Sequence, residues 1–120
     1  MIPSATSAAL TRVTRVRGVR CALLTSLGDA LPIAASAHVD VDIDALSAFA
    51  TAIFRHSCQA GEASGYGACH RFVLDASGGR LAAAGRADLL VVVLAERDTH
   101  PGLLRVSLQR ALEEITQGQP

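Results

Sequence analysis

Apolar residues recur at helical spacing near both ends of the chain. Residues 5–17 carry Ala9, Val13 and Val16 at i, i+4 and i+7, and Gly18 follows them. This spacing predicts a short first helix that stops near Gly18, because glycine readily adopts the left-handed conformation that ends a helix. A longer stripe begins after Pro101 and predicts a last helix. Its members are Leu104, Leu108, Ala111, Leu112 and Ile115.

Apolar runs bounded by turn residues predict five strands. They cover residues 19–26, 31–38, 69–76, 80–86 and 87–95. Gly28 lies between the first two, where we expect it to take a positive φ. Ser77, Gly78 and Gly79 are typical of a second hairpin turn. The run over 87–95 is almost continuously apolar, which predicts a central strand.

Residues 42–60 predict a middle helix that is apolar around too much of its circumference. Asp40 or Asp42 can cap its start. On a helical wheel the polar residues gather on one narrow side; they are Asp44, Ser47, Thr51, Arg55 and Gln59. The apolar arc covers roughly 200°, about twice what a helix lying on a sheet needs. A domain of this length has no further layer to cover the excess, so the arc predicts a partner, most simply a second copy of the chain.

The order helix, two strands, helix, three strands, helix predicts an α+β fold. We expect one domain over residues 1–120, with an antiparallel sheet of about five strands and helices on both faces. Residues 117–120 should fray, because little follows the last apolar position of the final helix.

Composition narrows the classes of partner. Eleven basic residues, all of them arginine, balance eleven acidic ones, and aromatic residues make up only 3% of the chain. A surface that stacks bases needs more aromatics, so we expect no nucleic-acid binding.

Three cysteines without framework spacing predict free thiols and a cytoplasmic location. A segment near the first hairpin imitates a signal peptide, but Gly28 and Pro32 interrupt it, and no apolar run is long enough for membrane insertion.

One group of residues has the chemistry of zinc ligands, namely His56, Cys58, Cys69 and His70. Two residues apart on a helix, His56 and Cys58 point about 200° away from each other, and neighbours on a strand point to opposite faces. We therefore expect no metal site. The chain also lacks a phosphate-binding glycine loop and a nucleophile elbow, so we expect no cofactor and no enzymatic activity.

Three stretches, taken in order, resemble the Roadblock/dynein light chain family. They are Gly18 through Ser36, the alanine-rich segment 42–60, and Leu90–Leu94 running on to Pro101–Arg105. The match covers nearly the whole chain. The first hairpin turn departs from the family pattern: it reads Gly-Asp-Ala-Leu-Pro over residues 28–32, where the family usually has Asp-Gly-Leu-Pro.

The resemblance implies a homodimer with paired central helices and abutting middle strands. As in bacterial gliding-motility regulators, it also implies a Ras-like small GTPase as partner, whose hydrolysis the dimer modulates without supplying catalytic groups. The expected dimer interface comprises Ala45, Ala48, Phe49, Ala52, His56 and Phe72. The polar side of the middle helix is expected to contact the GTPase. Two alternatives stay open. One is an adaptor that ignores nucleotide state, and the other is a small-ligand sensor with a roomy apolar pocket.

Overall fold

The computed structural model describes residues 4–117 and has three helices and five strands in the expected order. The elements are α1 (Ser4–Thr14), β1 (Val19–Ser26), β2 (Pro32–Ala37), α2 (Ile43–Ala63), β3 (Arg71–Ala76), β4 (Gly79–Arg86), β5 (Leu89–Ala95) and α3 (Pro101–Gln117). Gln117, expected to fray, is the last residue of α3, while residues 118–120 lie outside the described part.

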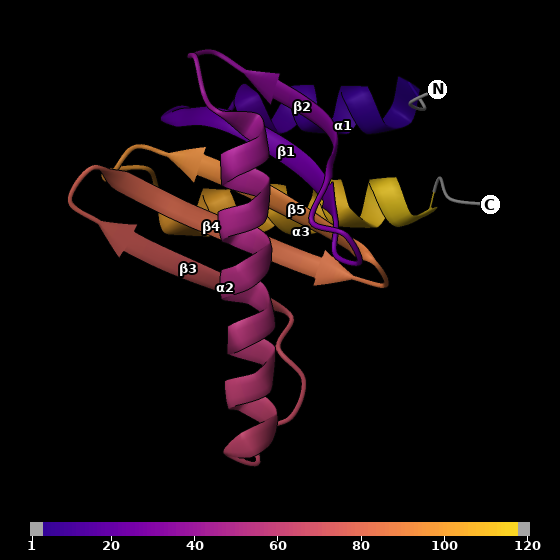
Figure 1. Cartoon of the computed structure of the whole chain (residues 1–120). Helices are drawn as coiled ribbons and strands as arrows, with labels where there is room; N and C mark the ends of the chain where they lie inside the picture. The colour runs from indigo at the N-terminus through magenta and orange to yellow at the C-terminus, as the bar shows by residue number, and fades with distance from the viewer. Residues whose placement is uncertain (1–3, 118–120) are drawn as a thin grey trace.

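The strands form one antiparallel sheet in the order β2-β1-β5-β4-β3. α2 crosses one face of the sheet, and α1 and α3 lie side by side on the other (Figure 1). The predicted α+β class, strand number and element order are confirmed. β5 is the central strand, as its apolar run indicates.

The sheet separates two apolar cores. Alternate β5 residues supply both, because side chains on a strand point to opposite faces. Val91 and Val93 pack with α1 and α3, whereas Leu90 and Val92 pack with α2. The predicted α3 stripe is buried in the first core at all five positions. α2 is therefore held on one face of the sheet and α1 and α3 on the other, and together the helices cover the inner strands almost fully.

The turn between β1 and β2 differs from its prediction. The positive φ falls on Ala30, at 60°, and not on Gly28. The Asp29 side chain accepts a hydrogen bond from the Leu31 amide at 3.1 Å, as Asp does in many tight turns, and this bond holds the turn around Ala30. Gly18 does have a positive φ, 93°, as expected.

Candidate protein-protein interface

α2 is positioned by its N-terminal cap and by its contacts with the sheet. Asp42 accepts a hydrogen bond from the Ala45 amide at 3.0 Å, which satisfies one of the free donors at the helix start. Ala50 and Phe54 are buried against the sheet. The Phe54 ring fits there because position 85, on β4, is a glycine and leaves room for it.

The opposite side of α2, called the outward face below, is exposed and largely apolar. It contains five of the six residues predicted for a dimer interface: Ala45, Ala48, Phe49, Ala52 and His56. The Phe49 side chain is 53% exposed, an unusual position for a large aromatic residue on a helix with a second, buried face. The excess apolar arc therefore remains uncovered within one copy of the chain.

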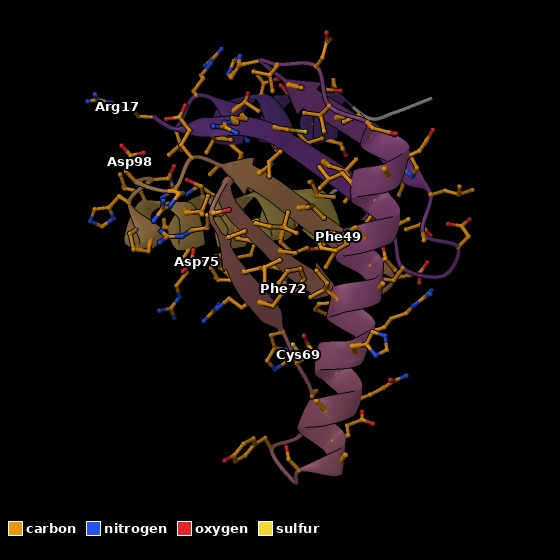
Figure 2. All side chains as sticks on the ribbon, turned by 60° about the vertical axis from the view of Figure 1, so that its left-hand side comes forward. Arg17, Phe49, Cys69, Phe72, Asp75 and Asp98 are labelled. Carbon is orange, nitrogen blue, oxygen red and sulfur yellow. The ribbon has the colours of Figure 1, made fainter. Side chains whose placement is uncertain are left out.

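The edge strand β3 lies beside this face. Within residues 4–117 it pairs only with β4, so its outer backbone groups have no strand partner. Phe72, the sixth predicted interface residue, is half-buried on the α2 side of the sheet, and Figure 2 shows it on β3 with Phe49 on α2. Val73 and Leu74 are 58% and 37% exposed. An open edge with exposed apolar side chains is the kind of strand that pairs with another chain.

The prediction that the polar side of α2 forms one exposed strip is wrong at two positions. Ser47 and Thr51 are buried against the sheet. The Ser47 hydroxyl donates to the Ala30 carbonyl at 2.8 Å and is also bonded to the Thr25 hydroxyl. A short hydroxyl side chain can be buried at modest cost when it has such partners, so its polarity alone does not place it in solvent.

The other three residues of that strip, Asp44, Arg55 and Gln59, are exposed. Arg55 is also tied to the first hairpin, since its Nη2 atom donates to the Gly28 carbonyl at 3.2 Å and to the Leu27 carbonyl. This contact links the middle of α2 to the β1–β2 turn. Sequence reasoning missed this link because no local pattern brings Arg55 near the turn.

Cys58 on α2 lies beside Cys69, which comes shortly before β3. The Cys58 thiol donates to the Cys69 carbonyl at 3.7 Å, and the Cys69 thiol donates to the Arg71 carbonyl at 3.3 Å. Burial, and then the neighbouring Cys58 thiol, raise the pKa of Cys69. His56 and His70 are exposed. Over residues 4–117, no group of three or more His, Cys, Asp or Glu side chains is arranged to hold a metal ion.

The helices of the described part include none that is both long and apolar enough to cross a bilayer. The arrangement of α2 and β3 instead offers two features suited to another protein, an apolar helix face and an unpaired strand edge.

No protein-family model matches the chain, and no curated protein matches its sequence. Solved structures do match. A Roadblock/LC7 domain from Streptomyces avermitilis aligns with a TM-score of 0.81 at 19% identity, covering 97% of this chain and 95% of its own. The gliding protein MglB from Thermus thermophilus aligns with a TM-score of 0.85 at 16% identity, covering 95% of this chain and 87% of its own.

A further solved structure, described as MglB with a tetrameric arrangement, aligns with a TM-score of 0.87 at 15% identity and covers 98% of this chain and 91% of its own. These likenesses extend over nearly the whole chain, so the match is to the complete fold and not to a shared fragment.

Proposed function

Because the chain has the Roadblock/LC7 fold, we propose that it forms a homodimer through the outward face of α2 and the open edge of β3, and that this dimer binds and regulates a Ras-like small GTPase. The observation that carries the proposal is the exposed apolar outward face, with Phe49 at its centre. Apolar surface of this kind marks a site of association in proteins that remain in water.

The two halves of the surface suit a two-fold pairing. Ala45, Ala48 and Ala52 are small, so a second α2 can approach closely. At the same time β3 can pair antiparallel with the β3 of the second copy, which would join two sheets and satisfy the open backbone groups. One of the solved structures with this fold is described as a tetrameric arrangement of MglB, which supports self-association.

The GTPase part of the proposal is supported by the likeness to gliding protein MglB and by the family resemblance of the sequence. The regulator supplies no catalytic group in this proposal: it binds the GTPase and repositions that protein's own residues. Asp44, Arg55 and Gln59 are exposed beside the outward face and are the proposed contacts. Ser47 and Thr51 are buried and are not part of that surface.

Sedimentation equilibrium tests the dimer. We expect the native chain to sediment with the mass of two copies and Ala52→Glu with the mass of one, because a carboxylate in an apolar interface would lose its hydration. Ala8→Glu is the matched control, since Ala8 is an exposed helical alanine on α1. A native chain that stays a single copy at every concentration would contradict the proposal.

A Ras-like GTPase encoded in the same genome, loaded with GDP or with a GTP analogue, tests the partner. We expect the dimer to bind the GTPase more tightly when it is loaded with the GTP analogue than with GDP. Arg55→Ala combined with Gln59→Ala should weaken this binding while the variant stays dimeric. Binding that ignores the nucleotide would favour the adaptor alternative. The regulator proposal fails if neither nucleotide form binds the dimer.

A further inference from the structure

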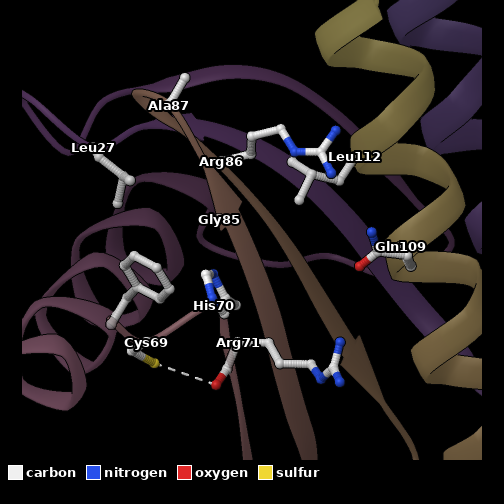
Figure 3. A pocket seen from close by; sticks show the side chains of 10 residues that line it. Leu27, Cys69, His70, Arg71, Gly85, Arg86, Ala87, Gln109 and Leu112 are labelled. Carbon is white, nitrogen blue, oxygen red and sulfur yellow. Dashed lines mark hydrogen bonds between the residues drawn. The ribbon is translucent and has the colours of Figure 1, made fainter. Parts of the chain in front are cut away.

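Two hollows adjoin at the start of β3, and the first is lined from both faces of the sheet, by Leu27 and Phe54 on the α2 side and by Gln109 and Leu112 on α3. The first, of about 820 Å³, lies where β4 extends past the start of β3 (Figure 3). The second, of about 510 Å³, lies between the start of β3 and α3. Arg71 and Gln109 line both. Together the two hollows are called the α3 groove below.

The α3 groove gathers positive charge. Arg86 lines the first hollow, Arg105 and Arg110 line the second, and Arg71 lies between them. Figure 3 shows Arg71 and Arg86 on the sheet side and Gln109 across from them on α3. The lining contains a single carboxylate, that of Glu113, which accepts a hydrogen bond from Gln109 at 3.2 Å.

These four arginines have no ion-pair partner within residues 4–117. The ion pairs of that part of the chain join Arg12 to Glu114, Arg20 to Glu96 and Arg80 to Asp75. Because the whole chain has a formal net charge of zero, the excess of cations in the groove is a local feature and not a general property of the surface. Such a concave cluster of one sign attracts an oppositely charged ligand.

We propose that the α3 groove binds an acidic peptide segment of a partner protein. Guanidinium groups match carboxylates in paired hydrogen bonds, and the four cations here are all arginines. Arg86 does not line the second hollow, and Arg105 and Arg110 do not line the first. The charges are thus spread along the groove, which suits a chain bearing several carboxylates better than a single phosphate.

The lining also disfavours a nucleic acid. Phe54 is the one Phe, Tyr or Trp side chain in the two hollows, and it is 7% exposed and held against Gly85. The exposed imidazole of His70 is therefore the only ring available to stack on a base. Val106, 53% exposed, adds an apolar contact suited to aliphatic side chains of a peptide. The groove is formed within one copy of the chain and does not depend on the GTPase proposal.

Fluorescence anisotropy with a defined probe tests this inference. The probe is a labelled peptide in which Glu alternates with Ser, compared with the same peptide carrying Gln in place of Glu. We expect the Glu peptide to bind and the Gln peptide not to bind, with affinity falling as salt is added, since exposed charges are screened. Arg71→Glu combined with Arg105→Glu should weaken binding by about tenfold or more.

The control is Arg15→Glu combined with Arg17→Glu, which makes the same charge change at the exposed turn after α1. It should leave the affinity within about twofold of the native value, which is below the effect of one close charge pair. Circular dichroism melts and sedimentation, run on both variants, separate loss of the groove from unfolding or loss of the dimer.

Three outcomes would overturn the inference. In the first, the Gln peptide binds as tightly as the Glu peptide. In the second, the control variant weakens binding as much as the groove variant does. In the third, inorganic phosphate or vesicles containing phosphatidylglycerol compete with the probe as effectively as unlabelled Glu peptide does. The first two would show that no specific cationic site exists. The third would show a site for phosphate groups or for a membrane surface.

Discussion

The ring of Phe54 on α2 lies directly over the backbone of Gly85 on β4. A β-carbon added at Gly85 would lie 2.7 Å from the Phe54 Cζ atom and 3.1 and 3.2 Å from the two ring atoms bonded to it. Gly85 is therefore required by contact with a neighbouring side chain, and its own φ is not positive. This contact fixes how closely the middle of α2 approaches the sheet.

We expect Gly85→Ala to lower the free energy of unfolding by about 1–2 kcal/mol, because it overpacks the core between α2 and β4. Gly78→Ala is the control, since a β-carbon there meets nothing within 4 Å. In a Phe54→Leu background the cost of Gly85→Ala should shrink, which urea denaturation of the four variants would measure as a coupling. Equal costs in both backgrounds would show that the ring does not set the constraint.

Removing each of two buried hydroxyls on α2 should change the stability of the fold in opposite directions. Ser47→Ala removes a bond to the Ala30 carbonyl and should destabilise the fold by about 1–2 kcal/mol. The Thr51 hydroxyl is buried with no hydrogen-bond partner within residues 4–117, so Thr51→Val should raise stability by about 1 kcal/mol. Thermal melts would distinguish them, and a destabilised Thr51→Val would mean that its hydroxyl is in fact satisfied.

Ala30 offers a stabilising change in the first hairpin. Its φ of 60° is costly for a residue with a side chain, by about 1–2 kcal/mol, and glycine removes that cost while adding flexibility to the unfolded chain. We expect Ala30→Gly to raise the free energy of unfolding by about 0.5–1 kcal/mol. Ala35→Gly in β2, where φ is not positive, should instead lower it. A loss of stability in both variants would contradict the strain at Ala30.

Stability should decline in alkaline solution through Cys21. Burial raises the pKa of the Cys21 thiol, so the folded protein keeps this proton at pH values where the unfolded chain has lost it. The contribution is complete below the unfolded thiol's pKa of about 8.5 and is lost as pH rises toward the folded value. Urea denaturation across this range, compared with Cys21→Ala, should show a smaller pH dependence in the variant.

The same burial predicts which thiols react. Cys58 and Cys69 are partly exposed, whereas Cys21 is fully buried in β1. We expect Ellman's reagent to modify Cys58 and Cys69 in the folded protein and Cys21 only after denaturant is added. Rapid modification of all three thiols under native conditions would show that β1 opens readily.

The sequence predicted the parts of the structure that depend on periodicity. The α3 stripe from Leu104 to Ile115 is buried in full, and the apolar run predicted over residues 87–95 contains the central strand, which begins at Leu89. These features are local, because the pattern of one segment decides which of its faces is covered. The outward face of α2, including Phe49 and Ala52, was also predicted from its own wheel, although its role as a dimer surface remains a prediction.

Features that depend on distant contacts could not be predicted in this way. Ser47 is buried because the Ala30 carbonyl and the Thr25 hydroxyl are close enough to form hydrogen bonds with it, and the sequence of the α2 segment does not predict either partner. The α3 groove forms because Arg71 on β3 comes to lie near Arg105 on α3. Arg105 is not a member of the apolar stripe of α3, but only the order of the strands brings β3 beside that part of the helix.

The position of β5 has a consequence for synthesis on the ribosome. Within residues 4–117 the β1–β2 and β3–β4 hairpins do not pair with each other. Each pairs with β5, which lies between β1 and β4 and joins the two hairpins into one sheet. A nascent chain that has released both hairpins still lacks their common neighbour until residues 89–95 leave the exit tunnel. The sheet can therefore close only after residues 89–95 have emerged, and until then the two hairpins expose apolar edges that a chaperone would recognise.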